Sequence, residues 1–101
     1  MVKLGLWVEL VAREGRERDV AAFLVDALPA VQRENGTVCW FGVRLDRTTF
    51  AIFDVFENED ARNIHLAGAV AEALGDRAGD LFVKPPEIRH LDVLAAKIGA
   101  G

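Results

Sequence analysis

The chain has 101 residues and a formal net charge of −4, with twelve basic and sixteen acidic side chains. Its length fits one domain over residues 1–101, and no run of Lys or Arg makes the cationic stripe that a nucleic-acid partner requires. Apolar residues make up 51% of the chain, more than so small a domain can bury, which predicts a homodimer. With no leader pattern and no apolar run of membrane-spanning length, we expect a soluble, cytoplasmic protein that does not bind membranes.

The first two predicted elements are a strand and an amphipathic helix. Apolar residues alternate from Leu4 to Val11 with the two-residue period of a strand. From Arg16 onward they recur at three and four residues, which indicates a helix that packs on a sheet. We expect Pro29 to bend this helix or shorten its last turn. Asn35 and Gly36 should end it, with the glycine in a left-handed conformation.

Two further strands are predicted as an antiparallel hairpin. Residues 37–45 are rich in aromatic and β-branched side chains, residues 46–48 make a short turn, and residues 49–56 form the third strand. In that strand one side carries Phe50, Ile52, Asp54 and Phe56, and the other carries Ala51, Phe53 and Val55. Because both sides are largely apolar, the sheet should be covered on both faces.

The helical region after Asn58 changes phase along its length. Asn58 suits a helix N-cap, and His65 lies on a face nearly opposite to the later apolar stripe. One straight helix cannot bury both faces against one sheet. We therefore predict a break near Gly68, with a short helix from Glu59 to about Ala67 and a second helix from about Ala69 to Leu81.

A last alternating segment over residues 87–94 completes the element order β-α-β-β-α-β. That order, with one hairpin in its middle, predicts an α+β domain in which a four-stranded antiparallel sheet carries helices on one face. The other face would be a large exposed apolar patch in a monomer. A symmetric dimer with the two sheets facing each other would cover it.

Three adjacent segments resemble the antibiotic biosynthesis monooxygenase (ABM) domain family of the dimeric α+β barrel superfamily. The third strand ends in Phe53-Asp54-Val55-Phe56, an acidic helix start follows over residues 57–60, and His65-Leu66 comes next. The resemblance implies a ferredoxin-like protomer, a dimer whose sheets close into a barrel, and a ligand pocket between sheet and helices. Members of the family include cofactor-independent oxygenases of aromatic polyketides and quinols, and haem-degrading relatives.

The sequence departs from the family pattern at several positions. Asp54 stands where the family often has Glu, and Phe56 stands where it often has Trp. The Asn, Trp and His set of the haem-degrading branch is not reproduced, because Phe56 replaces the Trp and Glu9 lies where the Asn is wanted. His65 and His90 lack zinc-site spacing, so we expect no zinc site, and the resemblance to cofactor-independent oxygenases implies that no cofactor is needed.

The predicted catalytic residues are His65 and Asp54. A neutral imidazole can remove a proton near pH 7, so His65 is the expected base and Asp54 the acceptor that orients it. In the structural alternative His65 bonds a backbone carbonyl, and Asp54 pairs with Arg44 or Arg89 across the sheet or dimer. The residues predicted to contact a flat aromatic ligand are Trp7, Trp40, Phe53, Phe56 and Ile64.

Two functions are compatible with these residues. The first, implied by the resemblance, is a cofactor-independent monooxygenase that acts on a quinol or polycyclic phenol. The alternative is a non-catalytic small-ligand-binding or stress-response protein with the same dimeric α+β barrel. The chain contains no serine and no nucleotide-binding glycine pattern, which removes serine-nucleophile and nucleotide-dependent mechanisms.

Overall fold

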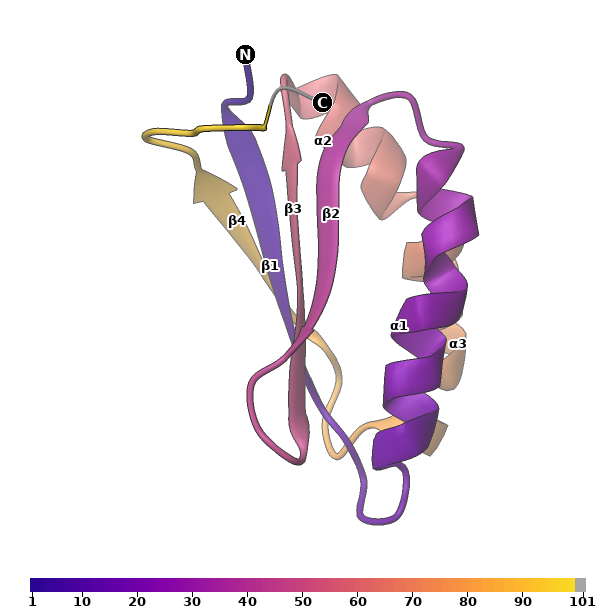
Figure 1. Cartoon of the computed structure of the whole chain (residues 1–101). Coiled ribbons are helices and arrows are strands. Elements are labelled where there is room, and N and C mark those ends of the chain that lie inside the picture. The colour runs from indigo at the N-terminus through magenta and orange to yellow at the C-terminus, as the bar shows by residue number, and fades with distance from the viewer. Residues whose placement is uncertain (100–101) are drawn as a thin grey trace.

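Residues 1–99 of the chain are described by a computed structural model, in which four antiparallel strands form one sheet with helices on one face (Figure 1). The strand order is β2-β3-β1-β4. The strands are β1 (Leu4–Val11), β2 (Thr37–Arg44), β3 (Thr49–Phe56) and β4 (Glu87–Asp92). The helices are α1 (Glu17–Gln32), α2 (Glu59–Leu66) and α3 (Ala69–Leu81). The predicted ferredoxin-like α+β fold is confirmed.

The hydrophobic core lies between the sheet and the helices. The two central strands supply alternate side chains to it, because residues two apart share one face of a strand. Its main members are Val8, Leu10, Val20, Leu24, Phe50, Ile52, Val70, Leu74, Leu81 and Phe82, all buried. Asp54 belongs to the same side of β3 as Phe50 and Ile52, so a carboxylate lies at one end of an apolar core.

The end of α1 differs from the prediction. The helix continues through Pro29 to Gln32, and the Arg33 N–H then reaches the carbonyls of Ala30 and Val31. The expected left-handed Gly36 is wrong, since Gly15, with φ of 84°, is the one positive-φ residue among those described. Gly36 instead permits a close approach, because a Cβ there would lie 2.9 Å from the Cβ of Ala61 in α2.

The predicted helix break near Gly68 is confirmed. Helix α2 ends at Leu66, α3 begins at Ala69, and Gly68 is the extended N-cap between them. Separate axes allow α2 to bury His65 over β3 while α3 buries Val70 and Leu74 in the core. The side chain of Asn58 accepts a hydrogen bond from the Ala61 N–H at 2.9 Å and thereby fixes the start of α2.

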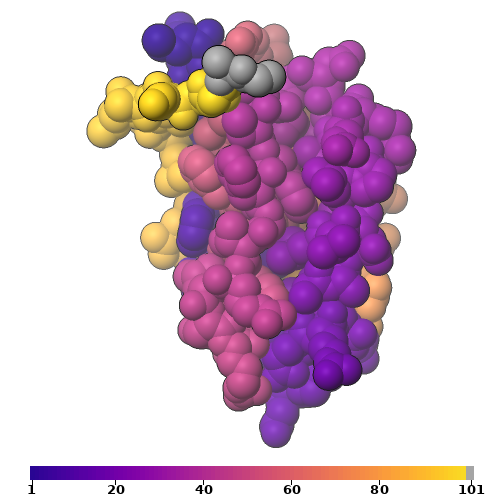
Figure 2. Space-filling view, viewed as in Figure 1, coloured from indigo at the N-terminus to yellow at the C-terminus, as the bar shows by residue number. Residues whose placement is uncertain are grey.

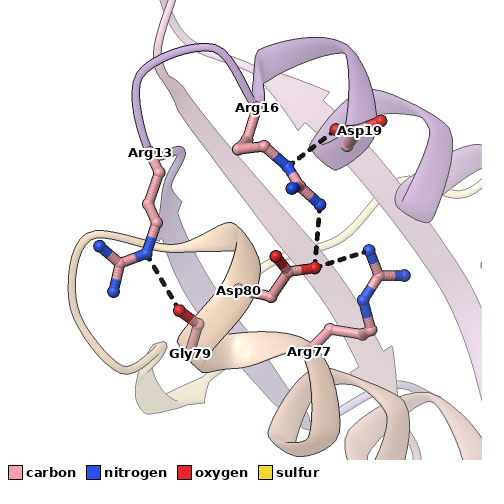
Figure 3. Close-up of polar contacts among 6 residues, drawn as sticks. All are labelled: Arg13, Arg16, Asp19, Arg77, Gly79 and Asp80. Carbon is pink, nitrogen blue, oxygen red and sulfur yellow. Dashed lines mark hydrogen bonds and ion pairs between the residues drawn. The ribbon is translucent and has the colours of Figure 1, made fainter.

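Arginine side chains close the far end of the helical layer (Figure 3). Arg13 donates through Nε to the Gly79 carbonyl at 3.0 Å, which joins the β1–α1 connection to α3. Arg16 bonds Asp80 at 2.9 Å and Asp19 at 2.8 Å. These half-exposed contacts tie the first turn of α1 to the last turn of α3, about as far from His65 as the helices extend.

The sheet face away from the helices has no helix over it and is apolar on β2 and β3, with charged residues near β4. Phe41 and Phe53 stack there with ring centroids 6.4 Å apart, and Phe41 is 52% exposed. The C-terminal segment crosses the upper end of the sheet (Figure 2), where residues 95–99 line an apolar hollow with Phe41, Phe53 and Val55. Most of this face remains available for contact with another surface.

Candidate functional site

A buried aspartate and a buried histidine meet between the sheet and α2. Asp54, on the helix-facing side of β3, is 0% exposed, and His65 in α2 is 6% exposed. His65 Nε2 lies 3.0 Å from Asp54 Oδ2. The strand period and the helix break bring the two predicted catalytic residues together, since a continuous helix would direct His65 away from β3.

A third acid completes the cluster. Glu34, in the connection between α1 and β2, places Oε1 2.5 Å from His65 Nδ1. Thr37 donates its hydroxyl to the same Glu34 oxygen at 2.7 Å. The Phe56 ring lies against the imidazole, with centroids 5.3 Å apart. His65 is therefore held between two carboxylates, with both of its ring nitrogens engaged.

The surroundings of Asp54 and His65 raise the pKa of both side chains. Burial raises the pKa of Asp54, and this effect outweighs the opposing hydrogen bond and charge of His65. Burial alone would lower the pKa of His65, but contacts with Asp54 and Glu34 raise it above its usual value. His65 therefore has a raised proton affinity, with Nδ1 bonded to Glu34 and Nε2 facing Asp54.

Asp54 has an incomplete set of partners. Its contact with His65 is short but poorly aligned, and neither carboxylate oxygen makes a well-directed hydrogen bond within the described chain. A buried carboxylate without such bonds is costly, and functional sites are where such costs are commonly retained. Asp54 consequently has free lone pairs at the floor of the cavity described next.

An apolar cavity of about 170 Å³ lies over Asp54 and His65. Its other walls are Leu6, Val8 and Ile52 from the sheet, Leu66, Val70, Ala71, Leu74 and Gly75 from the helices, and Pro86 and Ile88 near β4. The floor residues are buried, whereas Gly75 and Ile88 are exposed, so the mouth lies between α3 and the edge strand β4. Ligand pockets usually exceed 300 Å³, so this one suits a ligand of one or two rings.

A second, more polar cavity of about 210 Å³ lies on the other side of His65. It is lined by Glu34, Asn35, Gly36, Thr37, Asn58, Asp60, Ala61, Ile64 and His65. His65 contributes to both cavities, and Asp54 lines only the apolar one. The three-residue cluster therefore separates an apolar compartment from a polar one.

The predicted ligand contacts are divided between the two faces of the sheet. Phe56 touches His65, and Trp40 lies beside Asp54 on the neighbouring strand. Trp7 and Phe53 are paired across β1 and β3 on the face away from the helices. Ile64 lines the polar cavity and is 69% exposed. The structure thus places two of the five predicted contacts beside the catalytic pair.

The structural alternatives for the two predicted catalytic residues are not observed within residues 1–99. Arg44 lies over the Phe50 ring with its guanidinium carbon 4.9 Å from the centroid, and Arg89 pairs with Glu87. Neither arginine contacts Asp54 in the described chain. His65 uses its nitrogens for carboxylates and not for a backbone carbonyl, because two acids are within reach.

The sequence reasoning missed Glu34. It lies beyond the expected apolar stripe of α1, among residues assigned to the end of that helix. Its position before the Asn35-Gly36 pair was the available signal, because Gly36 allows the connection to approach α2 closely. No group of three or more metal-ligating side chains in residues 1–99 is arranged to hold an ion. Within the same residues, every helix is too short or too polar to cross a membrane.

Comparison with known proteins places the chain beside a solved structure. No family model and no curated protein matches it. The NE2512 protein of Nitrosomonas europaea, described as of unknown function, is 44% identical, covers 100% of this chain and 98% of its own, and has a TM-score of 0.97. The chain belongs to the same family as NE2512. Membership in the NE2512 family fixes the fold and leaves the activity open.

More distant structures share the same fold. A "putative antibiotic biosynthesis monooxygenase" from Caulobacter crescentus is 18% identical over 93% of this chain and 92% of its own, with a TM-score of 0.79. Another from Nitrosomonas europaea is 14% identical over 91% and 90%, with a TM-score of 0.80. The NE2512-family chain therefore has the ABM-type fold expected from its sequence.

Proposed function

We propose that the chain is a cofactor-independent monooxygenase that oxidises a small phenol or quinol in the apolar cavity. The observation that carries this proposal is Asp54, a buried carboxylate with unsatisfied lone pairs at the floor of that cavity. A general base needs a free lone pair and an elevated proton affinity, and Asp54 has both. The ABM-type fold supports the same reaction class by analogy.

In this proposal the expected roles of the two residues are exchanged. His65 is bonded to Glu34 through Nδ1 and faces Asp54 with Nε2, so it positions Asp54 and balances its charge. Asp54 accepts the phenolic proton. That transfer removes one negative charge from the cluster and places it on a delocalised ring, which the apolar walls tolerate better than a second localised anion.

The overall reaction needs only oxygen as co-reactant. The phenolate gives one electron to O₂, and superoxide combines with the aryloxyl radical at the ring carbon para to the oxygen. The resulting peroxide takes up a proton. Its O–O bond then breaks with loss of hydroxide, while the same ring carbon loses its hydrogen as a proton, which leaves a quinone. One phenol and one O₂ give one quinone and one water. A quinol would instead give a quinone and hydrogen peroxide.

The test is oxygen uptake with α-naphthol and with menadiol, two probes of two fused rings. The wild type should consume oxygen, and Asp54→Asn should lose about 10²–10⁴-fold in rate because it cannot accept the proton. His65→Ala should also lose activity, whereas His90→Ala, which changes an exposed histidine on β4, should not. Labelled O₂ should appear in the quinone made from α-naphthol. Equal uptake by the wild type and Asp54→Asn would refute the assignment.

A homodimer that covers the open sheet face is part of the proposal. Phe41, Val43 and Leu45 are each at least 38% exposed on or next to that face, a patch typical of an interface. Phe41→Glu should therefore convert a dimer into a monomer in sedimentation experiments, because a buried charge in each subunit would face an apolar surface. A wild-type chain that sediments as a monomer in dilute buffer would remove this part. A cytoplasmic location stays a prediction.

The alternative of a non-catalytic ligand-binding protein is favoured by one observation. Both nitrogens of His65 are occupied, as in a histidine that only joins β3, α2 and the α1–β2 connection. Such a protein would bind α-naphthol without oxygen uptake, and Asp54→Asn would leave its affinity nearly unchanged. Fluorescence titration alongside the oxygen electrode separates the two functions.

A further inference from the structure

We propose that Glu34 is a positioning residue of the site, whose carboxylate fixes the His65 ring and keeps it charged so that Asp54 remains ionised in the apolar cavity. The inference deepens the proposed function and rests on it for the role of Asp54. The effect of Glu34 on the charge of His65 can be measured in the absence of any catalytic reaction.

The geometry around Glu34 is restrictive. Oε1 is 2.5 Å from His65 Nδ1 and accepts the Thr37 hydroxyl at 2.7 Å, so two donors fix one oxygen. The Glu34 side chain is 16% exposed, low for an acid in a connection between elements. Gly68 leaves room for the other oxygen, because a Cβ there would lie 3.1 Å from Glu34 Oε2. These contacts place the carboxylate in one position.

Asp54, His65 and Glu34 lie in a row that runs from the apolar cavity to the polar one. Asp54 lines the apolar cavity, Glu34 lines the polar cavity, and His65 lies between them and reaches both. For Asp54, the hydrogen bond and charge of His65 outweigh the direct repulsion from Glu34. Loss of Glu34 should therefore affect Asp54 mainly through the charge of His65.

In the part of the chain that the structure describes, no Lys or Arg forms an ion pair with either carboxylate. Asp54 approaches His65 from β3, and Glu34 approaches it from the α1–β2 connection. Asp60 lines the same polar cavity as His65. The Arg62 guanidinium is directed to the Gly5 carbonyl at 3.4 Å. On β4, His90 lies opposite Leu6 and is exposed. Of these groups, Asp54 and Glu34 alone contact the ring, so removing Glu34 removes one of two stabilising charges.

The decisive experiment follows the NMR titration of the His65 ring in Glu34→Gln. Glutamine retains a hydrogen-bonding oxygen for Thr37 but no charge, so the chain should still fold. The His65 midpoint should fall by about one pH unit or more, a tenfold or greater loss of proton affinity, as is usual when an adjacent opposite charge is removed. Glu72→Gln, an exposed acid on α3, is the matched control and should leave the midpoint unchanged.

A rescue experiment uses the polar cavity. Glu34→Ala should show the same lowered midpoint, and added acetate should raise it again, because the cavity beside His65 has space for a small carboxylate. Chloride at equal ionic strength should not. An unchanged His65 midpoint in Glu34→Gln, or restoration by chloride as well as acetate, would overturn the inference.

Activity separates this inference from the proposed function. If the wild type is active, the low-pH limb of kcat/KM in Glu34→Gln should move to higher pH, because Asp54 loses its charged partner. If the wild type shows no oxygen uptake while the His65 midpoint still falls in Glu34→Gln, the proposed reaction fails and the control of His65 by Glu34 stands.

Discussion

Replacing His65 alone should cost more stability than replacing His65 and Asp54 together. Among the described residues, His65 is the one basic side chain in contact with Asp54, which is 0% exposed. In His65→Leu the leucine can still pack against Phe56, so little apolar contact is lost. The carboxylate, however, is left in the core without a partner and must either stay charged there or take up a proton.

The magnitude follows from the burial of Asp54. Breaking a buried ion pair by removing one partner costs about 3–5 kcal/mol, and a chain of this length has about 5–15 kcal/mol of total stability. His65→Leu should therefore lose about a fifth of the stability or more, and each kcal/mol should lower Tm by about 4–8 °C. In Asp54→Leu/His65→Leu no fully buried charge remains unpaired, because Glu34 is 16% exposed and keeps the Thr37 hydroxyl at 2.7 Å, and the double variant should lie within about 1–2 kcal/mol of the wild type.

The assay is guanidinium unfolding near neutral pH at one protomer concentration, because dimer formation would make stability concentration-dependent. A lower midpoint with an unchanged m-value reports lost stability. The double-mutant cycle then gives the coupling between the two side chains. If the double variant loses as much as the two single variants combined, the pair is not a compensated buried charge and the argument for Asp54 fails.

Three further predictions concern pH, the cavity mouth and a helix cap. The pKa values of His65 and Asp54 are both raised in the fold, so the free energy of unfolding should fall as pH rises through each folded pKa. The fall should be at most about 1.4 kcal/mol per pH unit for each group. Urea titrations that give a constant free energy of unfolding above pH 6.5 would contradict this prediction. Gly75→Leu should block α-naphthol binding, whereas Gly79→Leu on the same helix should not, because of these two glycines only Gly75 lines the apolar cavity. If fluorescence titration shows the same loss of affinity in both variants, the cavity mouth lies elsewhere. Asn58→Ala should cost about 1 kcal/mol in the same unfolding assay, and Asn58→Gly only a few tenths, since the side chain caps α2.

Local patterns were sufficient to predict most of the fold. The two-residue period located β1 and β3, and the change of phase after His65 located the break at Gly68 within one residue. Gly36 shows where such reasoning fails. A glycine after a helix suggests a left-handed cap, yet the constraint at Gly36 comes from Ala61, twenty-five positions along the chain. A close contact between residues far apart in the chain leaves no periodic pattern in the sequence around either of them.

The candidate site was predictable only for residues that lie on one regular element. Asp54 on β3 and His65 on α2 have side-chain directions that strand and helix periods determine, and the structure brings them together. Glu34 lies in a connection, where no period specifies direction. The period also separated Trp7 and Phe53 from the site, because alternate positions on β1 and β3 point to the opposite face of the sheet.

Gly68 connects the helix break to the chemistry of the site. The Gly68 N–H bonds the His65 carbonyl at 3.0 Å, and its missing side chain leaves space for Glu34. Gly68→Ala would place a methyl group 3.1 Å from Glu34 Oε2, closer than most Cβ contacts, and the carboxylate would have to shift by a few tenths of an ångström. The φ and ψ of Gly68 are allowed for alanine, and the methyl group would also lie 3.2 Å from the His65 carbonyl oxygen, so the end of α2 should shift slightly while α2 and α3 persist. A lowered His65 midpoint in Gly68→Ala, with unchanged helix content by circular dichroism, would show that the residue ending α2 also positions the acid that charges its histidine. An unchanged midpoint would mean that Glu34 has freedom the structure does not suggest.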